Sequence, residues 1–356
     1  MSDAPSLRVM TRNLYLGADI ERVVAAVGDP VAVGRAMLEL RATVAATDFS
    51  VRARLIAAEV AAPVPDVIGL QEAALWRERI GEAGDEVVTW DFLDSLLAEL
   101  SRAGCAYVVA VATDRADLAV PIPQGVAEAG GGADPEAKAP VEVRLTMRDV
   151  LLVREGVAIG ETAAGRYEAN LSVEVAGLTL APERGWQWVE VGVGERPVRV
   201  VNTHLESLGA DLTLAQAEEL HRALPTDRAV VVLGDFNSDP LDGRVREGAE
   251  AAPNAAYLAM LGAGFVDAWD VWAADGWAAE SEPGWTACLG EYLDDPAGAA
   301  FDHRLDFVFV RGGEGARLAV SAVVLTGATP DTRDPVTGLW ASDHAGVVVE
   351  LASPPA

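Results

Sequence analysis

The feature that most constrains the fold of this chain is a series of short apolar runs, each bounded by turn residues. The runs occupy residues 7–10, 67–70, 107–112, 150–153, 171–175, 188–193, 198–201, 229–233, 305–310, 320–325 and 346–351. Many are rich in valine, and β-branched residues in runs this short favour strands. Segments with helical spacing lie between them. They are residues 50–60, with Ser50 as the expected cap, and residues 90–103, 212–224 and 254–261.

The expected strands come both in consecutive groups and separated by helices. This mixture predicts an α/β fold in which two sheets pack together with helices outside, because a regular alternation would indicate a single wound sheet. The composition, with 51% hydrophobic and 23% charged residues, is that of a globular protein with a large core.

The 356 residues allow one large domain or two of ordinary size. Residues 121–140 are rich in glycine, proline and alanine and show no sustained periodicity. We interpret this stretch, within residues 113–140, as a mobile surface loop. A linker between two domains is the alternative, but strand-like runs continue on both sides without a change in composition. We therefore expect a single domain over residues 1–356.

The chain is strongly acidic. Its 27 Lys and Arg against 55 Asp and Glu give a formal net charge of −28. A protein whose whole surface binds nucleic acid or anionic membrane is therefore excluded, although a site neutralised by a divalent cation is not. No apolar run approaches the roughly 20 residues that span a bilayer, and no basic leader opens the chain. We expect a soluble monomer, cytoplasmic as written, or secreted if a signal peptide was removed before residue 1.

The two cysteines, Cys105 and Cys288, are too few for a disulfide framework. We expect buried free thiols, with a single disulfide as the alternative. Both cysteines look isolated in the sequence, and so do His221 and His303, so no Cys/His cluster indicates zinc.

Polar residues end several of the predicted strands. In residues 198–205, the period of two places Val200, Asn202 and His204 on one face. Taken alone, His204 is more often a structural histidine than a catalytic one. In residues 230–240, Asp235 and Asn237 follow an apolar strand and would project the same way if the chain is extended.

Such a carboxylate and amide suit proton transfer or the binding of an oxyanion or metal-bound water. A simple turn is the alternative, since Asp, Asn, Ser and Pro all favour turns. Three further segments end in oxygen-bearing side chains that suit Mg²⁺ or Mn²⁺. These side chains are Asn13, Glu72 and Asp343. Each fragment alone is equally compatible with a solvated strand end.

Together, and in this order, the fragments resemble the endonuclease/exonuclease/phosphatase superfamily. This group includes deoxyribonuclease I, apurinic endonucleases, inositol polyphosphate 5-phosphatases and neutral sphingomyelinases. The matching motifs are "MTRN" at Asn13, "IGLQE" at Glu72, "NTHLES" at His204, "GDFNSDP" at Asp235 and Asn237, "RLDFVFV" at Asp306, and "SDHAGV" at Asp343 and His344. They span residues 7 to about 351, nearly the whole chain. The resemblance implies a four-layer α/β sandwich, with two packed mixed β-sheets flanked by helices and the site at one edge.

The resemblance also implies roles for these residues. Glu72 and Asp343 would bind the principal Mg²⁺ or Mn²⁺, with Asn13 nearby. Asp235 would orient or deprotonate the attacking water, or bind a second metal ion. The remaining residues would act on the phosphate. They are Asn237, which would hold the phosphate or nucleophile, His204 and His344, which would stabilise or protonate phosphoester oxygens, and Asp306, which would orient His344. Whether Asp235 or His344 is the general base, and whether one or two metal ions bind, both stay open.

Three other segments are weaker candidates. We interpret Arg148 and Asp149 as an exposed pair rather than a substrate contact. The segment that contains Arg184 and Trp186 is assigned to packing. Thr286 only weakly resembles a family threonine near the site.

The prediction of the substrate class rests on the distribution of basic residues in the sequence. Basic runs that would bind a duplex are absent from the sequence, as are lysine-rich segments for a polyphosphorylated inositol ring. We therefore expect a metal-dependent phosphodiesterase for a small-molecule or lipid-like phosphoester, with an acidic DNA or RNA nuclease as the alternative. Residues 118–122 would be an apolar loop that contacts lipid or simply packs. A catalytically inactive binding module is a further alternative, but no expected site residue is missing.

Overall fold

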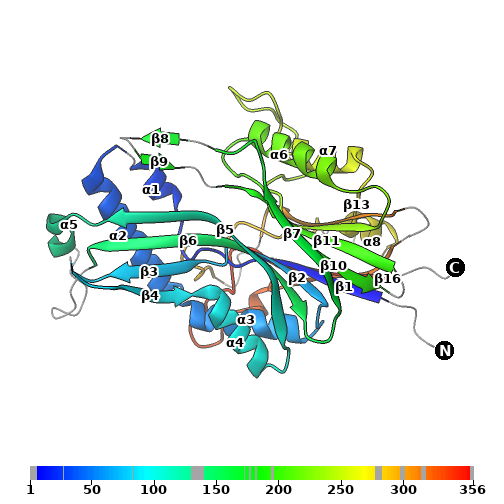
Figure 1. The fold of residues 1–356 in the computed structure, drawn as a ribbon, viewed down its shortest axis with the longest axis horizontal. Helices are drawn as coiled ribbons and strands as arrows, with labels where there is room; N and C mark the ends of the chain where they lie inside the picture. Colours follow the sequence, from blue (N-terminus) through cyan, green and yellow to red (C-terminus); the bar gives the residue numbers. More distant parts are fainter. Residues whose placement is uncertain are drawn as a thin grey trace.

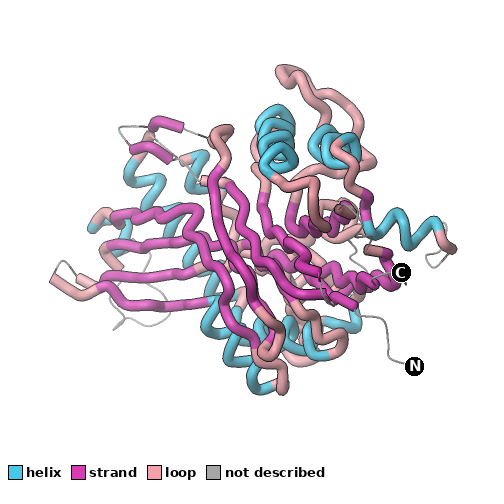
Figure 2. The backbone as a smooth tube through the Cα atoms, turned by 45° about the vertical axis from the view of Figure 1, so that its right-hand side comes forward, coloured by secondary structure: helices cyan, strands magenta, loops and turns pink. Residues whose placement is uncertain are grey.

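Two β-sheets form the centre of the protein, and helices cover their outer faces (Figure 1, Figure 2). The computed structural model describes residues 6–26, 28–81, 83–129, 140–171, 173–175, 178–180, 183–193, 196–276, 283–296, 301–313 and 318–352. The first sheet has the order β15-β16-β1-β2-β6-β3-β4, with β5 also paired to β6, and the second has the order β13-β14-β12-β11-β10-β7. Both sheets are mixed, because β1–β2 and β11–β12 are parallel and their other neighbours are antiparallel.

The strands of the first sheet are β1 (Ser6–Asn13), β2 (Val67–Gln71), β3 (Leu75–Arg79), β4 (Glu86–Asp91), β5 (Tyr107–Pro121), β6 (Glu142–Arg154), β15 (Ala319–Thr326) and β16 (Gly346–Ala352). Those of the second sheet are β7 (Ile159–Arg166), β10 (Gly185–Val193), β11 (Arg196–His204), β12 (Val230–Asp235), β13 (Val266–Asp267) and β14 (Asp306–Arg311). A separate hairpin joins β8 (Val173–Val175) to β9 (Leu178–Leu180). The helices are α1 (Glu21–Ala25), α2 (Pro30–Ala46), α3 (Phe49–Ala61), α4 (Phe92–Arg102), α5 (Gln124–Ala129), α6 (Ala210–Ala223), α7 (Ala255–Gly262) and α8 (Ala268–Ala274), with a 3₁₀ turn η1 at Pro330–Thr332.

The alternation of side chains along β11 shows how the layers form. Val198 and Val200 pack between the two sheets, against residues such as Val67 of β2. Val201 faces the other way and packs with Leu220 of α6 on the outer side of the second sheet. The predicted two-sheet sandwich flanked by helices is therefore confirmed, and the period of two sets which valines enter which layer.

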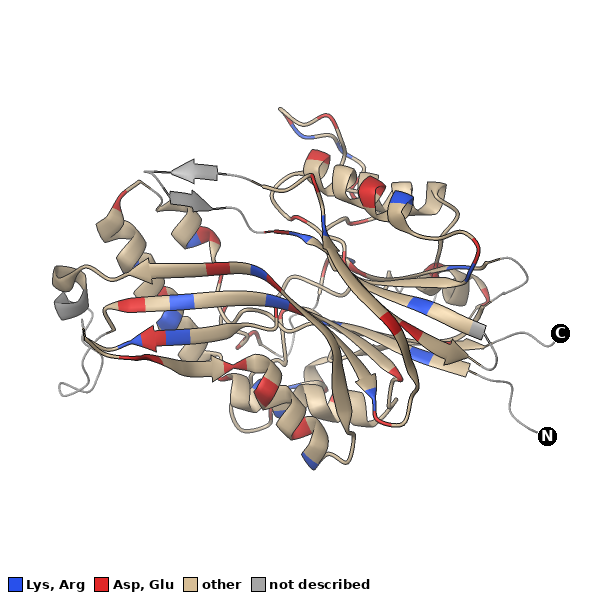
Figure 3. Ribbon diagram, in the orientation of Figure 1, with Lys and Arg blue, Asp and Glu red and all other residues tan. Residues whose placement is uncertain are grey.

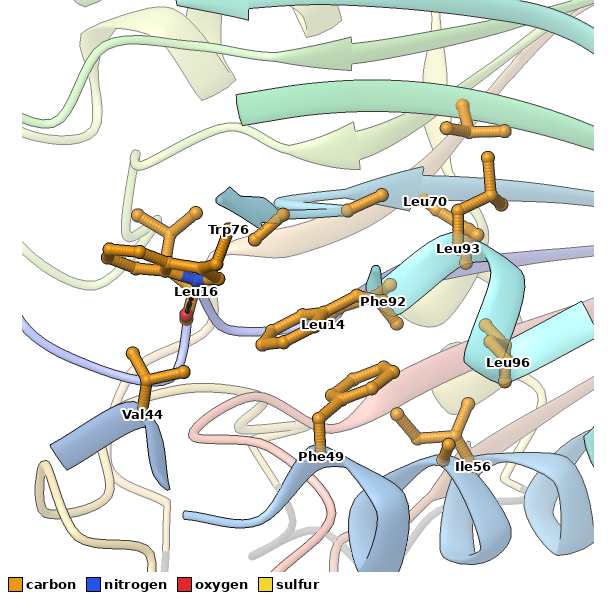
Figure 4. Close-up of a cluster of buried hydrophobic side chains, with 14 of the residues drawn as sticks. Leu14, Leu16, Val44, Phe49, Ile56, Leu70, Trp76, Phe92, Leu93 and Leu96 are labelled. Atoms are coloured by element: carbon orange, nitrogen blue, oxygen red, sulfur yellow. Dashed lines mark hydrogen bonds between the residues drawn. The ribbon is translucent and has the colours of Figure 1, made fainter. Parts of the chain in front are cut away.

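The outer face of the first sheet is covered by helices that also hold the loop after β1 (Figure 4). Phe49 of α3 stacks on Phe92 of α4 with ring centroids 3.8 Å apart. The indole Nε1 of Trp76 donates to the carbonyl oxygen of Leu16 at 3.2 Å. Since Leu16 lies three residues after the end of β1, this packing fixes the course of the chain leaving Asn13.

Two local predictions were wrong. The cap of α3 is Asp48 rather than Ser50, and its carboxylate accepts from the backbone N–H of Ser50 at 3.1 Å. The loop expected at 113–140 begins later, because β5 continues to Pro121 and α5 follows it. Residues 130–139 of that loop lie outside the described residues.

The apolar segment 118–122 belongs to β5 and the turn after it and is not a free loop. Val120 and Ile122 are buried in the core beneath α2. They are therefore unavailable for contact with a lipid, and the packing alternative holds for this segment. Within the described ranges, no helix is both long enough and apolar enough to cross a membrane.

Candidate active site

The predicted site residues meet at one edge of the sandwich because of the strand pairing. Asn13 ends β1 opposite Gln71 of the parallel neighbour β2, and Glu72 follows directly. In the second sheet, His204 and Asp235 stand opposite each other at the ends of the parallel strands β11 and β12. The carboxyl ends of parallel neighbours share one edge of a sheet, so each pair is brought to that edge together.

Asp306 joins them because β14 is antiparallel to β12. Its first residue, Asp306, lies opposite Asp235, the last residue of β12. His344 and Asp343 precede β16, which pairs antiparallel with β1, and they reach the same edge.

Asn13 connects the two sheets at this edge. Its amide Nδ2 donates to Asp235 Oδ2 at 3.1 Å and lies 3.4 Å from Glu72 Oε1. Its Oδ1 accepts from the backbone N–H of Tyr15 at 2.9 Å. The amide oxygen therefore holds the following loop, and Asn13 is placed to orient two carboxylates.

Glu72 and Asp343 are partly exposed, unlike the buried residues behind them. Glu72 adopts φ 57°, and its Oε2 accepts from the backbone N–H of Leu16 at 2.8 Å. Burial and the negative charge of Asp343 raise the pKa of Glu72. Burial raises the pKa of Asp343 as well, against the opposing charges of His344 and Arg52. The two carboxylates thus repel each other in partial desolvation, which a bound divalent cation would relieve.

His344 is held by a buried carboxylate. Its Nδ1 lies 2.8 Å from Asp306 Oδ2, and its Nε2 lies 3.8 Å from Asp235 Oδ2. Burial lowers the pKa of His344, but the charges of Asp306, Asp343 and Asp235 outweigh it and raise that pKa well above its usual value. These charges therefore favour the imidazolium form of His344 at neutral pH.

His204 differs from His344 in its protonation state. Its Nε2 lies 3.6 Å from Asp235 Oδ2. Burial and the positive charges of Arg184, His344 and Arg115 lower its pKa well below the usual value, so the ring is neutral. Two histidines on either side of one carboxylate thus differ in protonation. For His204 burial and nearby positive charges dominate, whereas for His344 three carboxylates outweigh burial.

Asp235 lies at the centre of this arrangement. Burial, with a contribution from Asp306 and against His344, raises its pKa to about 7. Ligand atoms of Asp235, Asp306 and His344 lie within 4.8 Å of one another. The Oδ1 atom of Asp306 is buried with no hydrogen-bond partner in the part of the chain that is described. The carboxylate oxygens of Asp235 and Asp306 at this edge, with those of Glu72 and Asp343 at its open side, are of the type that suits a hard divalent cation.

The backbone conformation of Asn237 was not predicted from the sequence. It has φ 46°, so the chain after Asp235 is not extended and the two side chains do not project in parallel. Its backbone N–H donates to Asp235 Oδ1 at 2.9 Å, and its Nδ2 donates to the carbonyl oxygen of Leu205 at 3.0 Å. The turn alternative is therefore right about the backbone, and that turn holds Asp235 next to the end of β11.

Two arginines near His204 were not identified as site residues from the sequence. Arg184 precedes β10, whose first residue Gly185 pairs with His204, and its charge acts on both His204 and Glu72. Its Nε is buried without a hydrogen-bond partner among the described residues, and the nearest carboxylate oxygen is Glu206 Oε2 at 3.7 Å. Arg115 is more fully paired, with its Nε 2.9 Å from Asp149 Oδ2. The sequence signal that identifies Arg184 is its place beside the strand start opposite His204.

The remaining weak candidates have structural partners. Arg148 is not exposed, since its side chain is only 12% exposed and its Nη2 lies 2.6 Å from Asp91 Oδ1. Thr286 is buried beside the site, where its Oγ1 accepts from the backbone N–H of Asp306 at 3.1 Å. Both cysteines are free thiols, as expected. Cys105 is buried, as predicted, but Cys288 is exposed, so the prediction of burial was wrong for Cys288.

Solved structures with this fold cover nearly the whole chain. A humanised D. rerio TDP2 with 14 mutations is 16% identical with a TM-score of 0.53, covering 98% of this chain and 100% of that chain. An endonuclease/exonuclease/phosphatase from Beutenbergia cavernae is 20% identical with a TM-score of 0.52, covering 98% and 72%. The human nocturnin catalytic domain with bound sulfate is 17% identical with a TM-score of 0.52, covering 98% and 94%. A comparison with curated proteins found no match.

These likenesses show the deoxyribonuclease I-like fold that the motifs implied. A family model extends the agreement to the sequence, because the endonuclease/exonuclease/phosphatase model matches residues 42–344. Members of this group are metal-dependent hydrolases of phosphoester bonds. The chain belongs to the endonuclease/exonuclease/phosphatase family.

Proposed function

We propose that the protein is a Mg²⁺- or Mn²⁺-dependent phosphodiesterase that acts on a small-molecule phosphoester. The observation that carries this proposal is the buried group of Asp235, Asp306 and His344 behind the partly exposed carboxylates of Glu72 and Asp343. In it, a cationic histidine and several acids meet at one open edge, the combination needed to hold an anionic phosphate and move protons around it.

Glu72 and Asp343 would hold the cation, with Asp235 as a further oxygen ligand or as the base. The ion, when bound, neutralises phosphate charge and lowers the pKa of a coordinated water. Side chains of the protein bind the phosphoester oxygens and transfer protons. His344, fixed by Asp306, donates a hydrogen bond or a proton to a phosphoester oxygen, and neutral His204 binds another.

Asp235 is the stronger of the two candidates for the general base. Its pKa of about 7 lies near neutral pH, where a base is most effective, whereas His344 is already protonated. Hydrogen bonds from Asn13 Nδ2 and the backbone N–H of Asn237 hold one carboxylate oxygen each. The attacking water would then be activated by Asp235 and would displace the leaving group in line.

The substrate class follows from where the charges lie. Basic and acidic residues are interspersed along the strands of the first sheet (Figure 3). Arg144, for example, forms ion pairs with Asp117 and Glu86. Paired arginines make weak contacts with a phosphate backbone, which argues against a general duplex nuclease. Val120 is buried, so residues 118–122 no longer support contact with a lipid, which favours a small-molecule ester.

The test is hydrolysis of bis(p-nitrophenyl) phosphate by the full chain. Activity is expected with Mg²⁺ or Mn²⁺ and should disappear after chelation with EDTA, because Glu72 and Asp343 alone leave the phosphate charge unopposed. Asp235→Ala should lower kcat by about 10²-fold or more. Full activity after exhaustive chelation, or normal turnover by Asp235→Ala, would refute the proposal.

A nuclease is the second candidate, because the family includes endonucleases and exonucleases. A panel of plasmid DNA, RNA, sphingomyelin, inositol phosphates and aryl phosphates, run with wild type and Asp235→Ala, separates the two. Cleavage of DNA or RNA at rates well above those of the small esters would favour the nuclease. Turnover that is equal in both proteins would show a contaminating activity and not this site.

A further inference from the structure

A second group of metal-binding side chains lies outside the site described above. Ligand atoms of Cys288, Asp302 and His303 lie within 4.8 Å of one another, and all three residues are exposed. No Cys/His cluster was expected from the sequence, because the two cysteines look isolated there. That interpretation was wrong, since the fold brings Cys288 and His303 together.

Backbone hydrogen bonds hold these side chains in place. The N–H groups of Thr286 and Ala287 both donate to the carbonyl oxygen of His303, at 2.7 and 3.0 Å, and the N–H of Asp302 donates to the carbonyl oxygen of Ala287 at 3.2 Å. Cys288 itself adopts φ 83°, an uncommon conformation for a residue with a side chain. The cluster is therefore built on paired backbone and does not depend on a chance meeting of mobile side chains.

The donor set differs from that of the catalytic centre. A thiolate, an imidazole and a carboxylate form a ligand set typical of Zn²⁺, whereas the oxygen ligands at Glu72 and Asp343 suit Mg²⁺. His303 Nδ1 lies 2.6 Å from Asp302 Oδ1, so the imidazole and the carboxylate already face each other. Water would complete a four-coordinate site.

The electric field at the sulfur favours a cation. The carboxylates of Asp302, Asp343, Asp235 and Asp306 all place negative charge near the Cys288 sulfur. A metal ion that binds the Cys288 thiolate displaces the thiol proton to solvent. The same carboxylates attract a divalent cation to this position.

The cluster is also bonded to the catalytic centre. The N–H of Cys288 donates to the carbonyl oxygen of Asp343 at 3.1 Å, and the N–H of Ala345 donates to the carbonyl oxygen of Thr286 at 2.6 Å. A divalent cation at Cys288 would therefore place positive charge close to Asp343 and oppose a second cation there.

We propose that Cys288, Asp302 and His303 form a second metal site, selective for a thiophilic divalent cation such as Zn²⁺, at the rim of the catalytic centre. Its occupation weakens the binding of Mg²⁺ or Mn²⁺ at Glu72 and Asp343. This inference goes beyond the proposed function, since it concerns a different site and a regulatory effect.

The first experiment titrates the reduced full chain with Co²⁺, which reports thiolate ligation through an intense near-ultraviolet charge-transfer band. The band is expected in wild type, absent in Cys288→Ser, and shifted to at least tenfold higher Co²⁺ concentration in His303→Ala. His221→Ala is the matched control and should titrate like wild type. Cys288→Ser retains Cys105, so a band that persists in this variant, or no band in folded wild type, would overturn the proposal. Circular dichroism establishes that each variant is folded.

The second experiment measures the coupling without any substrate. Binding of Mn²⁺ is followed by electron paramagnetic resonance with and without one equivalent of Zn²⁺. Zn²⁺ should weaken Mn²⁺ binding about fivefold or more in wild type, within the usual range of coupling between sites, and should have little effect in Cys288→Ser. Equal Mn²⁺ affinities with and without Zn²⁺ in wild type would refute the coupling. Because neither readout requires turnover, failure of the proposed phosphodiesterase activity would leave both results interpretable.

Discussion

The contact between Asp306 and His344 offers the sharpest test of the catalytic centre. Asp306 Oδ2 lies 2.8 Å from His344 Nδ1, in a pair that is almost fully buried. The substitution Asp306→Asn keeps the size of the side chain but removes its charge. The imidazolium form of His344 then loses its nearest opposing charge, so the pKa of His344 should fall.

The magnitude follows from the strength of the lost interaction. A hydrogen bond to a charged group contributes about 1.5–3 kcal/mol. If that stabilisation is expressed in the transition state, where His344 carries positive charge, the rate should fall about 10- to 150-fold, at about 1.4 kcal/mol for each factor of ten. The loss should grow with pH, because His344 deprotonates earlier in the variant.

The assay is the pH profile of kcat/KM for bis(p-nitrophenyl) phosphate at saturating Mg²⁺. In Asp306→Asn, the alkaline limb should move to lower pH. Asp267→Asn is the matched control, since Asp267 is also a buried carboxylate but pairs with Arg304 Nη1 at 2.8 Å rather than with His344. That control should lose thermal stability and keep its alkaline limb. An unchanged limb in Asp306→Asn, with a rate within threefold of wild type, would show that Asp306 does not act through His344.

Three further outcomes are expected. In metal-free protein, the pKa of Asp235 is about 7 against an ordinary value of 3.8, so the folded state binds its proton more tightly. The contribution of Asp235 to stability is therefore greatest below about pH 4 and is lost as the pH rises to about 7, and thermal melts should show a shallower decline in Asp235→Asn. Gly69→Ala should destabilise the protein by about 1–3 kcal/mol and lower the Tm, because a Cβ there would lie 2.0 Å from Leu233 Cδ1 and 2.6 Å from Asn202 Oδ1, and these buried side chains would have to move; a Tm equal to that of wild type would contradict the close approach of the sheets. Arg184→Ala should raise the pKa of His204, measurable by NMR titration of the ring, while Arg184→Lys should largely preserve it.

The fold was predictable because the apolar runs that indicate its strands are local in the sequence and recur along the chain. Valines that alternate along a strand have only two faces to occupy, and in β11 one face meets the other sheet while the opposite face meets a helix. The end of β5 was missed because its signal is weaker. Within residues 113–121 only Arg115 and Val120 are buried, so the sequence there lacks a continuous apolar run.

The site was predictable where it follows strand ends, and not where it depends on dihedral angles or on pairs of distant loops. Asn13, Glu72 and Asp235 each lie two or three residues after the end of an apolar run. The left-handed conformation of Asn237 has no signal of its own in the sequence, because asparagine tolerates both this conformation and an extended one. The pairing of Cys288 with His303 arises from backbone hydrogen bonds between two loops, which no spacing rule describes.

Arg184 shows how the strand-end argument can be extended. The residues identified from the sequence mostly follow strands, as His204 follows the apolar part of β11, but β10 is antiparallel to β11 and therefore begins where β11 ends. A polar residue just before the start of an antiparallel neighbouring strand reaches the same edge of the sheet as a polar residue at the end of a parallel strand. Asp306 at the start of β14 and His344 before β16 obey this rule as well. Had strand direction been assigned along with strand position, Arg184 would have been predicted beside His204, and its positive charge would have indicated which of the two histidines is neutral.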